Sequence, residues 1–250
     1  MERGDPMIEN KPKQVQVPYY VYNWGPCLVR IKITEKFQKE LLKEAYASRK
    51  ETLSMNTKLA GIIKEEYSYR NPDLFLPYFK DIFNLYWHAY TNFSNRKDKA
   101  QLKSPKYLLR ALWVNFQNQN EFNPPHDHSD ALSFVIYLQI PDELKREHKT
   151  YIGKSAGPGG IQFLYGPGAD RKYITYQSHF PEERDMFIFP ASLSHWVAPF
   201  KSNCTRISVS GNIADSVPIN TLPENVEFSQ APGQDAAKPV VKGKPDGSKR

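Results

Sequence analysis

The feature that most constrains this chain is a series of short strand patterns that begins after Pro105 and continues to Ile213. Strands are predicted over 107–116, 120–126, 131–140, 160–165, 171–177, 185–189, 194–199 and 204–212. Gly- and Pro-rich turns separate them. Many short strands after a helical segment are typical of a β-sandwich or jelly roll with helices packed outside. We therefore predict an α+β fold with a jelly-roll core of the cupin-like, double-stranded β-helix type.

Two helices are predicted ahead of these strands. Thr34 is a suitable N-cap for the first, whose apolar residues recur at helical spacing from Phe37 until the helix ends near Ser48. Asp73 is the predicted cap of the second, which runs from Leu74 to about Phe93 and carries a stripe of aromatic residues. Such a stripe at helical spacing favours core packing over a cofactor site.

The other segments define the predicted domain organisation. Short strands are expected at 18–22 and 27–33 around a turn, 56–67 is either a short helix or a covering loop, and 141–159 is a polar insertion with a turn at 157–160. We predict a flexible arm over 1–17, a helical and strand support segment over 18–105, a jelly-roll core over 106–222 and a disordered basic tail over 223–250.

The charge of the chain is concentrated at its end. The formal net charge is +7, and residues 229–250 hold five basic and two acidic residues, or +3 of that total. The basic pI therefore does not call for a nucleic-acid partner. No apolar run approaches the roughly 18 residues of a membrane helix, and the first residues lack a signal-peptide pattern. Cys27 and Cys204 lie far apart, which does not suggest a disulfide framework.

A compact group of potential metal ligands lies just before the strand at 131–140. The stretch from Phe122 to Asp130 contains His126, Asp127, His128 and Asp130. In an extended segment, residues two apart share a face, so His126 can pair with His128, or His128 with Asp130, whereas Asp127 faces away. Imidazole and carboxylate groups together suit a non-haem Fe(II) site. Such a site needs a third ligand, and the distant His195 can provide it.

An arginine follows the distant histidine by 11 residues. The segment from Cys204 to Ser210 alternates, which places Arg206, Ser208 and Ser210 on one face and two apolar residues on the other. A charged side chain that points into a barrel needs a partner. A carboxylate of a bound ligand could fill that role through a bidentate pair with Arg206, reinforced by the Ser208 hydroxyl. An ion pair with an internal acid, or a surface position, is the alternative.

This constellation resembles the Fe(II)/2-oxoglutarate-dependent dioxygenases, whose pattern is His-x-Asp/Glu, a distal His and an Arg-x-Ser about ten residues later. The resemblance covers roughly Tyr107 to Ile213. It implies that Asn115 and Tyr137 also face the 2-oxoglutarate, as in some members and in the prolyl-hydroxylase-like branch. Gly159-Gly-Ile-Gln-Phe163 is similar to a strand of that branch.

The chain is most similar to a group of uncharacterised phage and bacterial 2-oxoglutarate oxygenases. The shared features are the His-x-His, the segment Leu132 to Tyr137, Trp24-Gly-Pro26 and Leu59-Ala-Gly61. The resemblance aligns His126 with the first His of the family and His128 with its carboxylate. The carboxylate is then either replaced, giving a site of three histidines, or supplied by Asp130.

The resemblance implies an oxygenase that uses Fe(II), 2-oxoglutarate and O2 to hydroxylate a substrate, with a peptide or protein side chain as the suggested class. We expect a cytoplasmic protein, in the host cytoplasm if a phage encodes it, without a membrane or nucleic-acid partner. Two other readings remain open. A cupin-like metal-binding protein would need the histidines but not Arg206, and a non-catalytic jelly-roll interaction module would need neither. The segments 51–72 and 141–159 are the expected substrate-facing parts.

Overall fold

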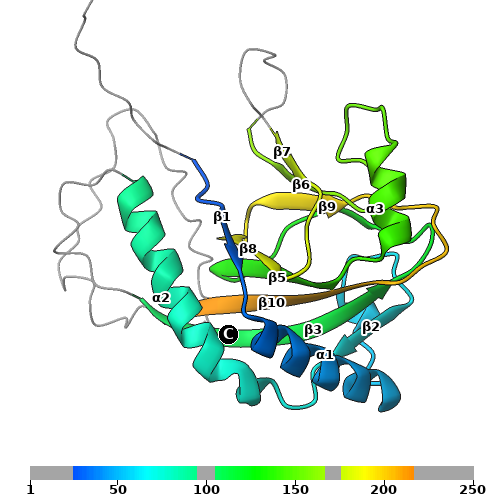
Figure 1. Ribbon diagram of the computed structural model, residues 1–250. Helices are drawn as coiled ribbons and strands as arrows, with labels where there is room; N and C mark the ends of the chain where they lie inside the picture. Colours follow the sequence, from blue (N-terminus) through cyan, green and yellow to red (C-terminus); the bar gives the residue numbers. More distant parts are fainter. Residues whose placement is uncertain (1–24, 95–104, 167–175, 217–250) are drawn as a thin grey trace, which may run out of the picture. The chain divides into compact units, whose positions relative to one another are not determined.

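The larger of two antiparallel sheets is the central element of the fold (Figure 1). The structure is a computed structural model, and it describes residues 25–94, 105–166 and 176–216. Six strands lie in the order β1-β8-β5-β10-β3-β2. Their bounds are Val29–Lys32 for β1, Asp185–Pro190 for β8, Leu132–Gln139 for β5, Arg206–Ser216 for β10, Lys106–Gln117 for β3 and Glu65–Ser68 for β2.

A second sheet of four strands faces the first and closes the sandwich. Its order is β4-β9-β6-β7, with Asn123–His126 as β4, Ser194–Val197 as β9, Ile161–Leu164 as β6 and Tyr176–His179 as β7. Apolar side chains of both sheets meet between them, among them Val135, Phe187 and Phe163. Two packed antiparallel sheets with strands contributed from distant parts of the chain confirm the predicted jelly-roll core.

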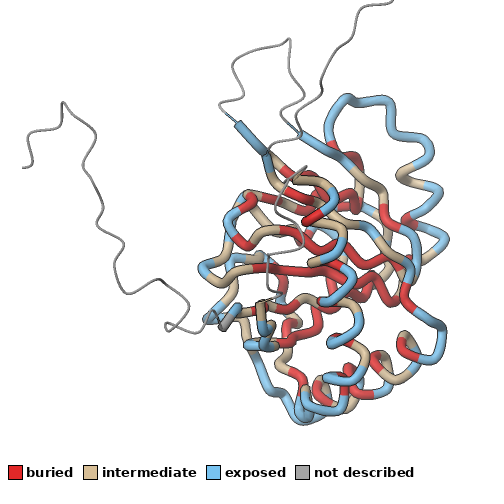
Figure 2. The backbone as a smooth tube through the Cα atoms, turned by 90° about the vertical axis from the view of Figure 1, so that its left-hand side faces the viewer, coloured by how far each residue is buried: buried red, intermediate tan, exposed pale blue. Residues whose placement is uncertain are grey.

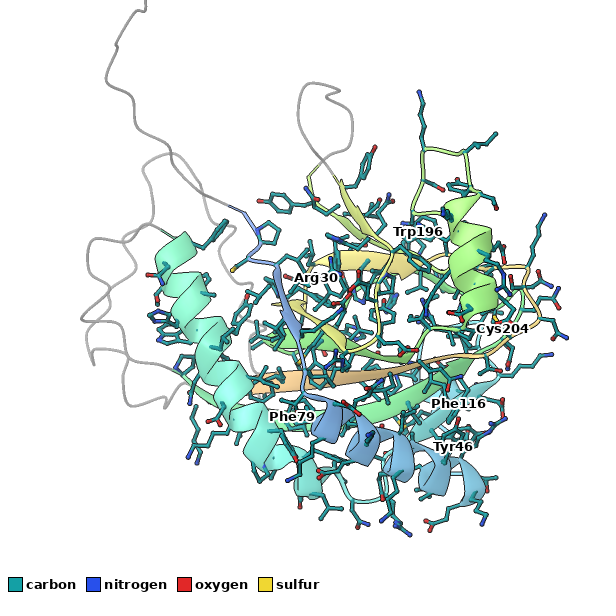
Figure 3. All side chains as sticks on the ribbon, in the orientation of Figure 1. Arg30, Tyr46, Phe79, Phe116, Trp196 and Cys204 are labelled. Atoms are coloured by element: carbon teal, nitrogen blue, oxygen red, sulfur yellow. The ribbon has the colours of Figure 1, made fainter. Side chains whose placement is uncertain are left out.

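Two helices cover the outer face of the large sheet, as predicted. Helix α1 spans Glu35–Lys50 and helix α2 spans Leu76–Phe93. The Thr34 hydroxyl caps α1 by accepting a hydrogen bond from the backbone N–H of Phe37 at 3.3 Å. The aromatic stripe of α2 is core packing, because Phe79 is buried against Phe37 of α1 and Phe134 of β5. Figure 3 shows Phe79 on α2, and Tyr46 of α1 near Phe116 of β3.

One prediction about the helices was wrong, and one helix was not predicted. A 3₁₀ turn over Pro72–Phe75 precedes α2, so the helix begins later than predicted and Asp73 makes no side-chain cap. Pro72 occupies the first position of that turn, where its missing N–H costs nothing. The segment 141–159 is a polar insertion, as predicted, and it also contains helix α3, Asp142–Lys149, whose single buried side chain is Leu144. One apolar residue in eight left no periodicity to detect.

The predicted strands were otherwise found with small shifts at their ends. The segment 56–67 consists of a short 3₁₀ helix, Asn56–Lys58, followed by the edge strand β2. The turn at 157–160 is present, since Gly157 and Gly159 adopt positive φ and the Gly160 N–H donates to the Gly157 carbonyl. The expected strand 18–22, the arm 1–17, most of 171–177 and the tail 223–250 lie outside the described residues.

Alternation along the strands separates two faces of the large sheet. Ile207 and Val209 belong to the apolar cluster under the helices, whereas Ser208 lies opposite Asn115 and Tyr137 on neighbouring strands and faces the small sheet. Residues directly opposite in an antiparallel pair share a face. In Figure 2 the central strands are accordingly buried, while loops and outer helix faces are exposed. The polar row between the sheets is where a ligand can be bound.

Gly211 of β10 offers a test of the packing under the helices. A Cβ at this position would lie 2.4 Å from Cζ of Phe134, a side chain held by Phe79. We predict that Gly211→Ala lowers the free energy of unfolding by about 1–3 kcal/mol, measured by urea denaturation. Gly153→Ala is the matched control: its Cβ would lie 2.1 Å from the Tyr151 hydroxyl, but that side chain is exposed and can move. Equal losses for both variants would contradict this account.

Candidate metal centre and its cavity

Strand pairing places two histidines side by side. His126 ends β4 and lies directly opposite His195 of β9 in the antiparallel register, so both side chains project from the same face of the small sheet. Their ring centroids are 4.3 Å apart. The histidine that is 69 residues away in the sequence is thus a nearest neighbour in the fold, as predicted.

The backbone fixes the orientation of both rings. The Nδ1 atom of His126 lies 2.8 Å from the Pro124 carbonyl oxygen, and Nδ1 of His195 lies 2.9 Å from the Leu193 carbonyl oxygen. A carbonyl oxygen only accepts, so each Nδ1 carries the proton and donates. Each Nε2 is therefore left with a free lone pair, which is the arrangement that metal-binding histidines show.

His128 completes a group of three. Its ring centroid is 5.1 Å from that of His126 and 5.4 Å from that of His195. One ring nitrogen from each of the three lies within 4.8 Å of the others. The backbone N–H of His128 donates to the Ala191 carbonyl oxygen at 2.9 Å, which ties the loop after β4 to the end of β8. Three imidazole nitrogens that converge in this way are suited to hold one transition-metal ion.

Burial keeps two of these rings neutral. Burial is the first cause and the nearby His126 imidazole the second, and together they lower the pKa of His195 to about 3 and the pKa of His128 to about 4. His195 is only 6% exposed. Both side chains are therefore unprotonated at neutral pH, as a metal ligand must be.

Neither aspartate of the stretch belongs to the converging group of ligands, although Asp127 also lines the cavity that the histidines line. Asp127 is exposed, in keeping with the predicted alternation. Asp130 lies 3.7 Å from Nε of Arg110 and is not among the residues that converge with the histidines. Of the two ligand sets that the sequence left open, the structure brings together the one with three histidines.

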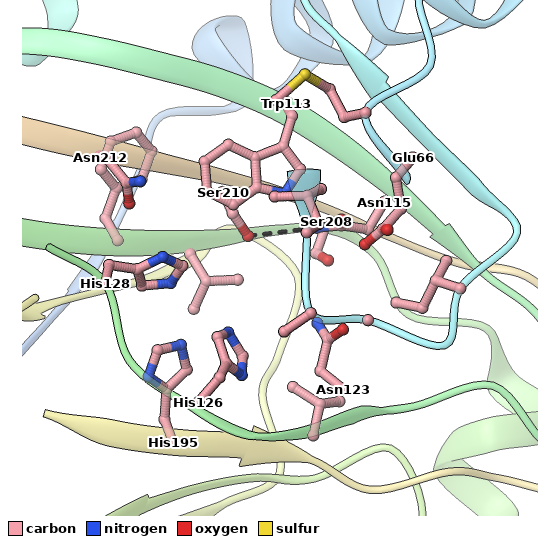
Figure 4. Close-up of a pocket in the computed structure, with 18 of the residues that line it drawn as sticks. Glu66, Trp113, Asn115, Asn123, His126, His128, His195, Ser208, Ser210 and Asn212 are labelled. Carbon is pink, nitrogen blue, oxygen red and sulfur yellow. Dashed lines mark hydrogen bonds between the residues drawn. The ribbon is translucent and has the colours of Figure 1, made fainter. Parts of the chain in front are cut away.

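The histidines open into a cavity of ≈ 270 Å³ between the sheets. A cross-strand row of Glu66, Asn115, Ser208 and Tyr137 lines it, because these residues are paired in register across β2, β3, β10 and β5. Figure 4 shows the histidines on one side and Asn115, Asn123 and Glu66 on the other, with the hydrogen bond from the Asn115 amide to Ser210 Oγ (3.3 Å) between them. Part of the segment 51–72 lines the cavity, whereas no residue of 141–159 does.

Arg206 is a buried cation without an acidic partner among the described residues. It is 2% exposed, and its Nη1 donates to the Gly159 carbonyl oxygen at 2.7 Å. Its Nε has no hydrogen-bond partner, and its guanidinium lies 5.2 Å from the centre of the Tyr137 ring. Burial lowers the pKa of Arg206, yet a guanidinium keeps its proton in proteins. The ion pair with an internal acid, one of the alternatives from the sequence, is not formed.

Three buried polar atoms of the predicted 2-oxoglutarate residues have no partner: Arg206 Nε, the Tyr137 hydroxyl and Asn115 Oδ1. Burial raises the pKa of Tyr137 to about 12, so its hydroxyl keeps its proton and can donate. Orphaned buried donors are costly in a folded protein unless a ligand satisfies them. Two donors and a positive charge at one end of the cavity fit a carboxylate, and three imidazoles fit Fe(II).

Sequence reasoning missed Glu66, Trp113 and Asn123, which also line the cavity. Glu66 lies on β2, a segment predicted only as a helix or loop. Its neighbour Glu65 is also acidic, so the pattern did not indicate which of the two points inward. Trp113 and Asn115 alternate along the predicted strand 107–116, and this spacing could have found Trp113.

The segment that carries these residues matches a known family. Residues 111–212 match the family model described as "Putative 2OG-Fe(II) oxygenase". The match contains His126, His128, His195 and Arg206, and it confirms the predicted resemblance to the Fe(II)/2-oxoglutarate-dependent oxygenases. The matched core is thus similar to that of a class of oxygenases whose members use Fe(II), 2-oxoglutarate and O2. No curated protein matches the chain.

Solved structures of similar fold include three prolyl hydroxylases. A viral collagen prolyl hydroxylase from Paramecium Bursaria Chlorella virus-1 is 14% identical, with 74% of this chain and 94% of that chain covered and a TM-score of 0.44. A Pseudomonas putida prolyl-4-hydroxylase is 11% identical (75% and 92% covered, TM-score 0.46). A prolyl hydroxylase from Trichoplax adhaerens, in complex with a hypoxia inducible factor peptide fragment, is 10% identical (76% and 84% covered, TM-score 0.46).

Among the described residues, no helix combines the length and the apolar character that crossing a membrane requires.

The buried His195 predicts a pH dependence of stability. Its pKa in the folded state is about 3, against 6.5 for an unperturbed histidine. Below pH 6.5 the unfolded chain takes up a proton that the folded protein does not, so the free energy of unfolding of the metal-free protein falls as the pH is lowered. The slope from this group approaches about 1.4 kcal/mol per pH unit. In His195→Gln, urea denaturation between pH 6.5 and 4 should show a shallower slope, and an unchanged slope would contradict the burial of a neutral ring.

Proposed function

We propose that this protein hydroxylates its substrate at an Fe(II) site held by His126, His128 and His195, with 2-oxoglutarate bound toward Arg206. The observation that carries the proposal is the shared cavity, in which three converging imidazoles lie near a buried guanidinium that lacks a carboxylate partner. A metal-binding protein without 2-oxoglutarate chemistry has no use for the unpaired Arg206. A non-catalytic jelly roll has no use for either group.

His126 and His195 would bind the metal through Nε2, because a backbone carbonyl accepts a hydrogen bond from Nδ1 of each ring. The Pro124 and Leu193 carbonyls hold the rings of His126 and His195 in place by accepting from Nδ1, so these ligands are oriented before the metal binds. Three neutral ligands leave the centre one unit more positive than two histidines with a carboxylate would. The extra charge favours binding of the anionic co-substrate beside it.

Arg206, Tyr137 and Ser208 form the proposed end for the far carboxylate of 2-oxoglutarate. Arg206 Nε and the Tyr137 hydroxyl both have a free proton to donate, and Ser208 lies next to Tyr137 across the strand pair. Asn115 lies on the other side of Ser208 and is the proposed fourth contact. Hydrogen bonds from a charged donor in a buried site are worth more than those at a surface.

The bound iron, 2-oxoglutarate and O2 supply the oxidant for hydroxylation, with succinate and CO2 as by-products. The protein contributes orientation of the reactants and exclusion of water, because the cavity walls are buried side chains of both sheets. For the substrate, we propose a peptide or protein side chain, supported by the prolyl-hydroxylase-like segment from Gly159 to Phe163.

The most general test is binding of Fe(II) and 2-oxoglutarate under nitrogen. We expect the visible charge-transfer absorption that a 2-oxoglutarate chelate of Fe(II) produces, and slow release of succinate when O2 is admitted. If the folded protein binds Fe(II) without this absorption, the result would contradict the oxygenase and support the cupin-like metal-binding protein. If the folded protein binds no metal, the result would support the non-catalytic interaction module.

Replacement of Arg206 tests the co-substrate end. We predict that Arg206→Met weakens 2-oxoglutarate binding by roughly tenfold to a hundredfold, the range for losing a charged hydrogen-bond partner. Fe(II) binding should be retained, because the histidines do not contact this side chain. Arg110→Met, which removes an exposed arginine, is the matched control and should leave both affinities unchanged. Unchanged 2-oxoglutarate affinity in Arg206→Met would overturn the assignment.

Replacement of the candidate ligands distinguishes the two metal sets. We predict that His128→Ala and His195→Ala each reduce Fe(II) affinity by more than the roughly 10–100-fold expected for losing an outer-sphere partner. Asp130→Asn should change it by less than about twofold, since Asp130 lies beside Arg110. Competition with a fluorescent chelator under nitrogen measures all three affinities. A large loss in Asp130→Asn with none in His128→Ala would reverse the assignment.

A further inference from the structure

Glu66 is a buried acid that the proposed iron and 2-oxoglutarate sites do not use. It is 1% exposed and lines the same cavity, opposite Asn115 in the register of β2 and β3. Its Oε2 has no hydrogen-bond partner. The neighbouring Glu65 has the opposite orientation and forms a salt bridge with Arg49 at 2.7 Å. Figure 4 shows Glu66 beside Asn115 and above Asn123, on the side of the cavity away from His128.

Glu66 has no paired cation among the described residues, although Lys58 and Arg206 line the same cavity. Within residues 25–94, 105–166 and 176–216, no lysine or arginine forms an ion pair with it. The acid whose charge acts on Glu66 is Glu121, whose carboxylate accepts hydrogen bonds from the backbone N–H groups of Lys64 and Asn118. Burial, and then the charge of Glu121, raise the pKa of Glu66 to about 7. A cation placed beside Glu66 would therefore relieve an unfavourable interaction.

A second unpartnered oxygen lies next to the same point of the chain. Oδ1 of Asn123 is buried without a hydrogen-bond partner. A Cβ on Gly61 would lie 2.2 Å from this oxygen and 2.9 Å from Oε1 of Glu66, so only glycine allows the loop to lie against both. An amide can rotate to present its NH₂ group, whereas a carboxyl group offers acceptors only once it is ionised. Because its pKa is about 7, Glu66 is partly protonated at neutral pH without a ligand, and a bound cation would complete its ionisation and donate to it.

We infer that Glu66 and Asn123 form a substrate subsite for a cationic nitrogen group, either a guanidinium or an ammonium. The substrate is accordingly a basic side chain or an amine. Arg206 attracts the anionic co-substrate, whereas the carboxylate of Glu66 repels it. The two charges therefore favour binding of 2-oxoglutarate near Arg206 and of the cationic substrate near Glu66 within one cavity. The inference rests on the proposed function, since it places the substrate beside the three histidines.

The test uses small probes that differ in charge but little in shape. The protein is labelled with ¹³C at its glutamate carboxyl carbons and titrated with methylguanidinium, methylammonium and the neutral methylurea. The Glu66 resonance, assigned with Glu66→Gln, should shift and saturate with one of the cations at a concentration at least about tenfold lower than with methylurea. The Glu65 resonance, assigned with Glu65→Gln, should not saturate, which makes it the internal control.

Two outcomes would overturn the inference: neither cation saturates the Glu66 resonance, or methylurea does so equally well. If Glu66→Gln does not fold, the charge preference is tested instead by comparing the binding of two peptides to the wild-type protein. A capped peptide with a central arginine should bind the wild type at least about tenfold tighter than the same peptide with citrulline, and Glu65→Gln should keep that preference. Equal binding of the two peptides would overturn the inference.

The titrations are run on metal-free protein and again with Zn(II), a diamagnetic stand-in for Fe(II), and 2-oxoglutarate. Loss of the charge preference in both states, while Zn(II) and 2-oxoglutarate still bind, contradicts the subsite alone. Failure of Zn(II) and 2-oxoglutarate to bind contradicts the proposed function independently of the result with the cations.

Discussion

The unpaired positive charge of Arg206 is the constraint around which the cavity is organised. Transfer of a charge into a protein interior costs several kcal/mol even after relaxation. In the part of the chain that the structure describes, the Gly159 carbonyl and the Tyr137 ring are the contacts that offset it. Arg206 is held in this position because β10 lies between β3 and β5 in the large sheet and the helices cover the outer face of that sheet. An anion bound beside Arg206 would offset the cost of burying this charge.

The proposed metal centre depends on a second feature of the fold, the pairing of two short strands. The β4–β9 register sets His126 against His195, and backbone carbonyls fix the two rings, so no acidic side chain is needed to orient them. The departure from a site with a carboxylate ligand is therefore consistent with the local structure. Asp130, the carboxylate ligand that the two-residue spacing offered, lies beside Arg110.

Much of this could be predicted from the sequence because the relevant signals are periodic. Alternation placed Ser208 and Arg206 on the cavity face and separated Asp127 from the histidines. Elements whose sequence has no clear periodicity were not predicted. Helix α3 buries one residue. The edge strand β2 carries two adjacent acids, so Glu66 could not be assigned to the cavity. The choice between His128 and Asp130 also required the fold, since both satisfy the same two-residue spacing.

The most direct measurement is a crystal structure of the protein grown under nitrogen with Mn(II), as a stand-in for Fe(II), and 2-oxoglutarate. The account predicts one metal ion bound by the imidazoles of His126, His128 and His195, with the far carboxylate of 2-oxoglutarate paired with Arg206. A metal ion ligated by Asp130 in place of His128, or 2-oxoglutarate bound away from Arg206, would contradict it.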